Sequence, residues 1–457
     1  MLYFLHLISR GLVMLNRCFL SVFLLYLMNQ CFASSLKEVY ELAITNDPEL
    51  AAAEASFKAQ EEIMVQRRAA LLPSVSVGGG STVGERWILS NDIPSEPSGS
   101  HGWSASLSQP IFRIDSWYRF RQGKDLKAQA AANFAIAQQE LIVRVTDSYL
   151  TILESQAALT SAKAERDAVK RQLDQVQQRF DVGLVAITDV LEAQAAYDSS
   201  VVAVIEREGA QSISFEALLR ITGKTITEVS GIIEDMPITS PNPKSVEDWI
   251  ERALTNNFRL KAAKEGLRAA EKDVQIARSG HLPTINASAV WSHNVTEGRT
   301  FLGSKTNTRS YSINVNLPLY QGGQVRSASR QAVFNLASAQ ENFDYLQRTT
   351  VENTRNLFTA IKTDVARVRA RERSIESSQS ALDATKTGYQ VGTRNIVEVL
   401  QAQRQLYLAQ FQYASARYQY IRDNIRLKEI VGNLSPADVY SLDQFVEVES
   451  TIKRLSQ

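Results

Sequence analysis

The residues of this chain whose chemistry could be combined lie near two glycine turns, at Gly183 and Gly392. They are Thr188, Asp189, Tyr389 and Arg394. A carboxylate that accepts hydrogen bonds from a guanidinium and a phenol is held firmly, yet the contact can be released. The alternative is a solvated surface pair, which contributes less than about 1 kcal/mol. The residue types alone leave both interpretations open.

A second polar pair, Glu398 and Gln401, follows the turn at Gly392. Residues three apart on a helix lie on one face, so both side chains would point the same way. A carboxylate that lines a pore favours cations. The alternative is that Glu398 is an ordinary exposed residue of a helix.

The chain has no catalytic or metal-binding constellation. None of its four histidines, His6, His101, His281 and His293, has the spacing of a metal site. Serine and threonine are plentiful, but none lies in the sharp turn or beside the base that hydrolases use. The sequence therefore predicts a protein that is not an enzyme, with no catalytic residue, no metal and no cofactor.

Residues 1–33 have the composition of a secretory signal peptide. Two arginines precede or flank an apolar run from Cys18 to Met28, and Ala33 supplies the small residue that cleavage requires. A retained membrane anchor is the alternative, but the run is short for a span of ~20 residues. Met14 is an alternative start.

The charge and cysteine content limit what the exported chain could bind. Both cysteines, Cys18 and Cys31, lie in the predicted signal, which leaves no disulfide and no thiolate metal site. Two of the 50 basic residues also lie in the predicted signal. The rest of the chain has 48 basic and 49 acidic residues, which gives a formal net charge of −1. No basic stripe suggests binding to nucleic acid.

The remainder of the chain is an internal duplication. The pattern of Ser35–Pro73 returns at Ser245–Pro283, about 210 residues later, and the turn at Gly183 returns at Gly392. This period is too long for a solenoid repeat of ~20–50 residues. We therefore expect two structural repeats, 34–236 and 245–435, joined by a linker at 237–244 and followed by a C-terminal segment at 436–457.

Each repeat contains a long stretch without proline that is rich in helix-forming residues. A glycine interrupts each stretch once, which predicts helix pairs at about 116–222 and 322–431. Apolar residues follow the three-four spacing of a coiled coil: Ile142, Val145, Tyr149, Ile152 and Leu159. A helix over 116–180 would be ~100 Å long.

Alternation of apolar and polar residues predicts one β-hairpin in each repeat, at about 74–112 and 284–320. The polar stretches 90–102 and 294–309 are expected to be exposed loops. Strands of roughly ten residues with one apolar face suit an outer membrane barrel. Half-buried strands of soluble sheets alternate in the same way, so the strands alone leave that alternative open.

The number of strands decides what a membrane location would require. Four strands are too few, since barrels of this kind begin at about eight. Lipid does not tolerate an open strand edge. If the hairpins lie in a membrane, several chains must pool them into one barrel, and the helices would pool into one tube.

Long sequence runs resemble the TolC family of outer membrane efflux proteins, over essentially the whole mature chain. They are Arg171–Gln175, Gln178–Phe180, Val182–Val190, His281–Thr284, Leu317–Gly323, Gly388–Tyr389, Val391–Arg394 and Tyr407. The resemblance is closer to the member that gives the family its name than to the lipid-anchored members.

The resemblance implies a mainly α-helical homotrimer with a membrane β-barrel. Three chains would supply four strands each to one barrel of twelve, continued by a coiled-coil barrel of helices across the periplasm. An equatorial belt would contain 36–46, 231–256 and the residues after Pro436. The channel would be passive, working with a periplasmic adaptor protein and an inner-membrane pump of the RND, ABC or MFS type.

The family pattern also implies roles for the polar residues. Thr188, Asp189, Tyr389 and Arg394 would latch adjacent helix pairs shut at the periplasmic gate. The tip turns would contact the adaptor through Val182, Gly183, Leu184, Val391, Gly392 and Thr393. Glu398 and Gln401 would line the narrowest part of the bore. Members often carry aspartate at both ring positions, so Gln401 leaves about three carboxylates instead of six and predicts weaker block by polyvalent cations.

The predicted function is thus a trimeric outer membrane channel-tunnel, opened at its periplasmic tip by partner binding. It would serve as the exit duct of tripartite efflux pumps, of type I protein secretion systems, or of both. The alternative is an exported trimeric coiled-coil structural or adhesin protein without pore activity, whose heptads would run without paired hairpins.

Overall fold

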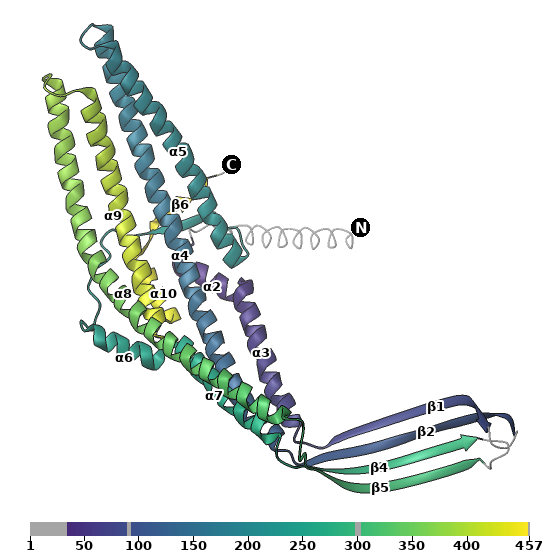
Figure 1. Cartoon of the computed structure of the whole chain (residues 1–457). Coiled ribbons are helices and arrows are strands. Elements are labelled where there is room, and N and C mark those ends of the chain that lie inside the picture. The colour runs from purple at the N-terminus through teal and green to yellow at the C-terminus, as the bar shows by residue number, and fades with distance from the viewer. Residues whose placement is uncertain (1–33, 89–92, 298–302, 456–457) are drawn as a thin grey trace, which may run out of the picture.

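The computed structural model describes residues 34–88, 93–297 and 303–455. The predicted signal peptide, residues 1–33, lies outside the described residues. The molecule is a long helical body (Figure 1). A four-stranded sheet extends from one end, and the two tight turns that connect the paired long helices form the other end. The sheet and the turns are therefore the most distant parts of the chain.

The first repeat begins with two short helices, α2 (Leu36–Asn46) and α3 (Pro48–Ala69). Ser35 and Glu38 form a capping box at the start of α2, and Asp47 caps α3 ahead of a proline at its first position. The hairpin of β1 (Ser74–Ile88) and β2 (Ile93–Phe112) follows. The long helices are α4 (Ile114–Asp181) and α5 (Ile187–Thr222).

The second repeat runs through the same order of elements. Its short helices are α6 (Val246–Asn256) and α7 (Phe258–Ser279), its hairpin is β4 (Thr284–Glu297) with β5 (Ser304–Asn316), and its long helices are α8 (Gln324–Gln390) and α9 (Ile396–Ile430). With 68 and 67 residues, α4 and α8 are each about 100 Å long. The five apolar residues at coiled-coil spacing on α4 are all buried.

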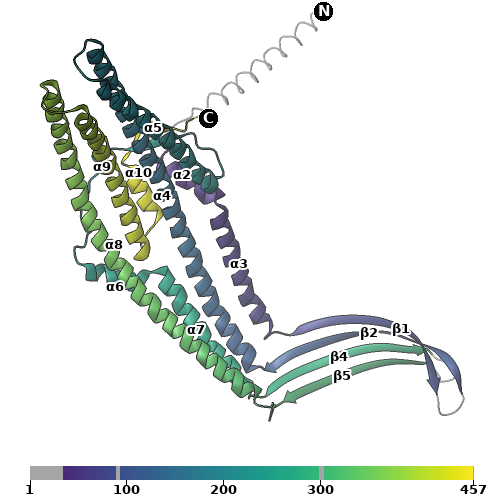
Figure 2. The same cartoon turned by 45° about the horizontal axis from the view of Figure 1, so that its top comes forward.

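Short elements wrap the middle of the helical body (Figure 2). Strand β3 (Glu228–Ile232) pairs with the C-terminal strand β6 (Val446–Lys453), and α10 (Pro436–Asp443) packs against α2. The largest buried side chains in this region, Tyr149, Phe215 and Leu36, come from α4, α5 and α2. The main hydrophobic core therefore lies at the level of this belt and joins both repeats.

The four-stranded sheet is antiparallel in the order β1-β2-β4-β5. Its strands have 15, 20, 14 and 13 residues, so the expectation of roughly ten-residue strands was wrong. The expected loops 90–102 and 294–309 are strand over 93–102, 294–297 and 304–309, whereas residues 90–92 and 298–302 lie outside the described residues. The described parts join the ladder because cross-strand pairing satisfies the backbone of Gly- and Ser-rich segments as well as that of apolar ones.

Among the residues that the structure describes, no helix combines the length and the apolar composition needed to cross a membrane.

Candidate functional site

Both helical tips are tight turns built on glycine. Gly183 and Gly392 have φ values of +77° and +81°, in the left-handed region that favours glycine. After each glycine the chain bonds back to the preceding helix: the Leu184 N–H donates to the Arg179 carbonyl at 2.8 Å, and the Thr393 N–H to the Gly388 carbonyl at 2.9 Å. Both turns leave apolar side chains exposed: Val182 and Leu184 at the first turn, and Val391 at the second.

A small core directly behind the turns holds the two helix pairs together. Its buried members come from all four long helices: Val176, Val190, Leu382, Tyr389, Ile396, Val399 and Leu406. Across this core, the Arg179 guanidinium on α4 lies 5.1 Å from the centroid of the Tyr389 ring on α8. The contact between a cation and an aromatic face joins the tip of the first repeat to that of the second.

The predicted latch residues are brought together only in part. Tyr389 is buried, and its hydroxyl has no hydrogen-bond partner among the described residues. Burial raises the pKa of Tyr389; Arg179 opposes this shift, and the nearby Asp189 carboxylate adds to it. Thr188 is exposed and Asp189 half-buried, at the start of α5. Asp189 and Tyr389 thus interact electrostatically within one chain.

Arg394 lies just before α9 (Ile396–Ile430) and instead pairs with Glu398, in the first turn of that helix. Arg394 Nη1 lies 2.6 Å from Glu398 Oε2. Glu398 also forms a capping box with Asn395, whose Oδ1 accepts from the Glu398 N–H at 2.9 Å. Arg394, predicted to belong to the gate latch, and Glu398, predicted to belong to the bore ring, are therefore direct neighbours. The Asn-x-x-Glu motif and the four-residue spacing could have revealed this from the sequence.

Gln401 is exposed one turn after Glu398, on the outside of the small tip core. The neighbouring Val399 is fully buried in that core. Glu398 and Gln401 thus lie on the part of α9 that the single chain leaves open.

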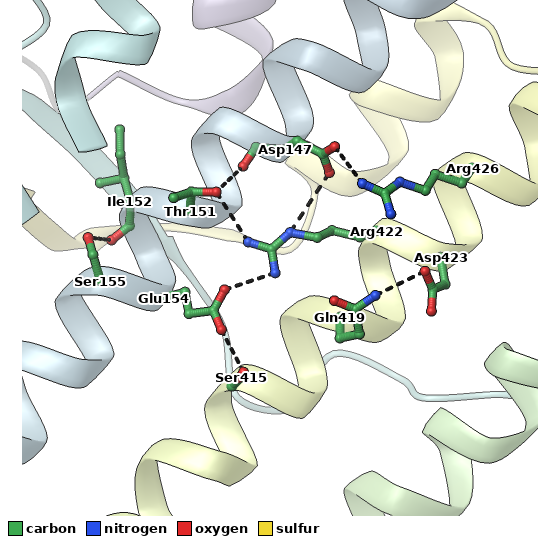
Figure 3. Close-up of polar contacts among 10 residues, drawn as sticks. All are labelled: Asp147, Thr151, Ile152, Glu154, Ser155, Ser415, Gln419, Arg422, Asp423 and Arg426. Carbon is green, nitrogen blue, oxygen red and sulfur yellow. Dashed lines mark hydrogen bonds and ion pairs between the residues drawn. The ribbon is translucent and has the colours of Figure 1, made fainter. Parts of the chain in front are cut away.

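A polar seam that the sequence analysis missed joins α4 to α9 near the belt (Figure 3). Arg422 Nη1 lies 2.9 Å from Glu154 Oε2, and Arg422 Nε lies 3.8 Å from Asp147 Oδ1. Arg426 Nη2 reaches the other Asp147 oxygen at 3.1 Å. Ser415 donates to Glu154 as well. The acidic side chains of Glu140, Asp147 and Glu154 recur every seven residues, a signal that the sequence carried.

The sheet has two chemically different faces. Residues paired across the strands share a face, and the register places Val75, Leu107, Ala289 and Tyr311 in one row of one face. The other face carries rows of hydroxyl groups. Ser76 and Ser106 lie 2.7 Å apart between their oxygens, as do Ser288 and Ser312.

Comparison with known proteins gives a consistent result. The model of the family described as "Outer membrane efflux protein" matches residues 39–224 and 249–433. The outer membrane protein TolC of Vibrio cholerae is 34% identical, covering 94% of this chain and 98% of that protein. The alkaline protease secretion protein AprF of Pseudomonas aeruginosa is 27% identical, covering 94% and 92%.

Solved structures agree on the fold. The Campylobacter jejuni CmeC outer membrane channel superposes with a TM-score of 0.75 at 16% identity, covering 91% of each chain.

Proposed function

Because this chain belongs to the outer membrane efflux protein family, we propose that it is the passive exit duct of a tripartite efflux pump, a type I protein secretion system, or both. It is a channel protein of the outer membrane, not an enzyme. The similarity to a protein named for protease secretion supports including protein cargo. The proposal also covers four finer features of the duct: the homotrimer, the periplasmic gate, the bore ring and the partner proteins.

The two-faced sheet with free edges carries the proposal of a trimer. In the described part of the chain, β1 pairs only with β2 and β5 only with β4, so each has one unpaired edge. An apolar face suits lipid and a hydroxyl-rich face suits water. Since lipid requires closure, β5 of one copy pairs with β1 of the next, and three copies make a twelve-stranded barrel.

An apolar stripe on α5 supports the same assembly at the level of the helices. Leu191, Val202, Ile205 and Ile213 are each more than half exposed, with helical spacing. A soluble surface rarely leaves such a stripe uncovered. In the trimer it packs against the helices of the neighbouring copy and closes the tunnel.

The gate lies at the tips, where Thr188, Asp189, Tyr389 and Arg394 act as the latch. Within one chain, the Asp189 carboxylate contributes to the raised pKa of Tyr389, which supports assigning both residues to one latch. In the closed trimer Arg394 leaves Glu398 and bonds Thr188 and Asp189 of an adjacent helix pair. Glu398 and Gln401 line the bore beside it, with Glu398 supplying one carboxylate per copy.

Partner binding opens this gate. The exposed turns Val182–Leu184 and Val391–Thr393 are the contact surface for a periplasmic adaptor, because they combine apolar side chains with the most remote position from the sheet. The adaptor links the duct to an inner-membrane pump of the RND, ABC or MFS type.

The test combines oligomeric state with conductance. Detergent-solubilised protein should have the mass of three chains and should form small, closed-state conductance steps in planar bilayers. Ile205→Glu should prevent trimer formation, because it places a charge in the α5 interface, whereas the exposed Glu206→Gln on the next helix position should not. A monomer, or a trimer that never conducts, would reject the duct; the latter would favour a coiled-coil spacer.

A further inference from the structure

The apolar face of the sheet is grooved along its length. A hollow of about 290 Å³ is lined by Val75, Leu107, Ala289, Tyr311, Trp291 and Arg309. A second hollow of about 490 Å³ shares Leu107, Ala289 and Tyr311, and continues to Ala287 and Ile313. Because the two share three residues, they form one continuous depression, which we call the alanine groove after Ala287 and Ala289.

Aromatic residues and a cation close the groove at its end remote from the helices. Trp103 and Trp291 meet edge to face, with 5.1 Å between ring centroids. The Arg309 guanidinium lies 5.3 Å from the Trp291 centroid, opposite it on the neighbouring strand. Arg309 forms no ion pair with a carboxylate of the described residues, so its charge is held in place without being neutralised.

A second cation lies beyond Arg309 on the same face. Lys305 is exposed and likewise has no carboxylate partner within the described ranges. Asn307 lies between the two cations and is bonded to His293, at 2.7 Å. None of the residues that pair across the sheet in the rows of Lys305, Asn307 and Arg309 is acidic. Glu297, beyond these rows, lies 3.8 Å from His101. These three rows therefore carry a net positive charge.

We infer that the alanine groove and Arg309 form a binding site for one phosphorylated glycolipid of the outer leaflet. An acyl chain lies over Ala287 and Ala289, and a phosphate accepts hydrogen bonds from Arg309, with Lys305 as a second contact. From Arg309 to Ile313 the strand runs about 13 Å, which at a tilt of ~40° is about 10 Å along the membrane normal and less than half of a ~25 Å apolar band. The groove thus fits one leaflet.

The leaflet is assigned from the proposed function, on which this inference rests. If the helices extend into the periplasm, the end of the sheet remote from them lies toward the cell exterior (Figure 1). In β5 the chain runs from that remote end, at Ser304, to Asn316 beside the helices, so Arg309 lies nearer the exterior than Ile313 does. The anionic lipid of that leaflet is a phosphorylated glycolipid, whereas glycerophospholipids such as phosphatidylglycerol occupy the inner leaflet. Tryptophan rings beside a headgroup are typical of this boundary.

The test measures lipid retained by the purified trimer with native mass spectrometry. Arg309→Gln should lower the bisphosphorylated lipid A retained per trimer about tenfold, the loss expected for one charge-assisted hydrogen bond. Arg309→Lys should restore part of the retention, because it keeps the charge. Arg330→Gln removes an exposed cation of α8 and should have no effect.

Competing vesicles identify the lipid. Lipid A should displace the bound glycolipid, and phosphatidylglycerol should not. Unchanged retention in Arg309→Gln would overturn the site, and equal displacement by phosphatidylglycerol would overturn its assignment to a glycolipid. Conductance of the wild-type trimer in phosphatidylcholine bilayers tests the duct separately. If the channel conducts but the retention or the displacement experiment contradicts the inference, only the lipid site is wrong.

Discussion

Arg394, which directly precedes the N-cap of α9, forms an ion pair with Glu398 in the first turn of that helix, with 2.6 Å between Nη1 and Oε2. Both side chains are at least one-third exposed, so the pair contributes only about 0.3–0.5 kcal/mol. The guanidinium can therefore leave Glu398 for a better partner at small cost. If the latch takes Arg394, it also uncovers the Glu398 carboxylate, which couples the gate to the ring.

Arg394→Ser should loosen the closed entrance and raise the resting single-channel conductance severalfold, because the latch loses its guanidinium. Folding stability should change by less than about 0.5 kcal/mol, since only the exposed pair is lost. Planar bilayer recording and thermal denaturation measure the two effects. Arg404→Ser, at an exposed position of α9, is the control. An unchanged conductance in Arg394→Ser would contradict the latch.

Glu398→Gln should weaken both the preference for cations and the block by trivalent cations, because it removes about three carboxylates from the trimer's bore. Glutamine can still complete the capping box with Asn395, so the start of α9 should be kept. Gln401→Asp is the opposite test and should strengthen the block by doubling the charge. Reversal potentials in a salt gradient provide the measurement. Tight block that survives Glu398→Gln would refute the placement of the ring.

Arg422→Gln should destabilise the protein by about 1–3 kcal/mol, because it leaves Glu154 and Asp147 without their shared, largely buried cation. Arg426→Gln removes a more exposed partner of Asp147 and should cost less than about 1 kcal/mol. Urea denaturation midpoints of the two variants allow a direct comparison. Equal effects would show that the seam at Arg422 contributes no more than a surface pair.

The buried carboxyl group of Asp364 on α8 predicts a pH dependence. Burial and the adjacent Asp423 on α9 raise the pKa of Asp364 from 3.8 to about 6, while Arg367 opposes the shift. The folded chain then holds this proton more tightly than the unfolded chain does. The stability that the group contributes is complete below about pH 4 and is lost as the pH rises through about 6.

Asp364→Asn should therefore flatten the decline in unfolding free energy between about pH 4 and pH 6. The measurement is a series of denaturation curves across this range. Asp383→Asn, at an exposed position of α8, serves as the control and should keep the wild-type profile. A wild-type stability that rises steadily from pH 4 to pH 6, with no difference in Asp364→Asn, would contradict the raised pKa.

Much of the architecture follows from local patterns in the sequence. Helix α4 was expected over 116–180 and spans Ile114–Asp181, because proline-free stretches of helix formers leave few alternatives. The glycine turns were located to the residue, since positive φ restricts the choice of side chain. The strands were correctly located but expected to be too short. Segments rich in Gly and Ser have a weak tendency to form strands, and only pairing with a neighbouring strand shows that they belong to the sheet.

Contacts between distant elements required the tertiary structure. Glu154 and Arg422 are separated by 268 residues, and nothing in either segment specifies the other. Likewise, Arg179 and Tyr389 meet only because α4 and α8 reach the tip together, and Asp364 meets Asp423 only through the rotation of α8 against α9. Periodicity determines which residues share a face of one helix. Which face meets which neighbour, and at what height, is decided by packing of the whole set of helices.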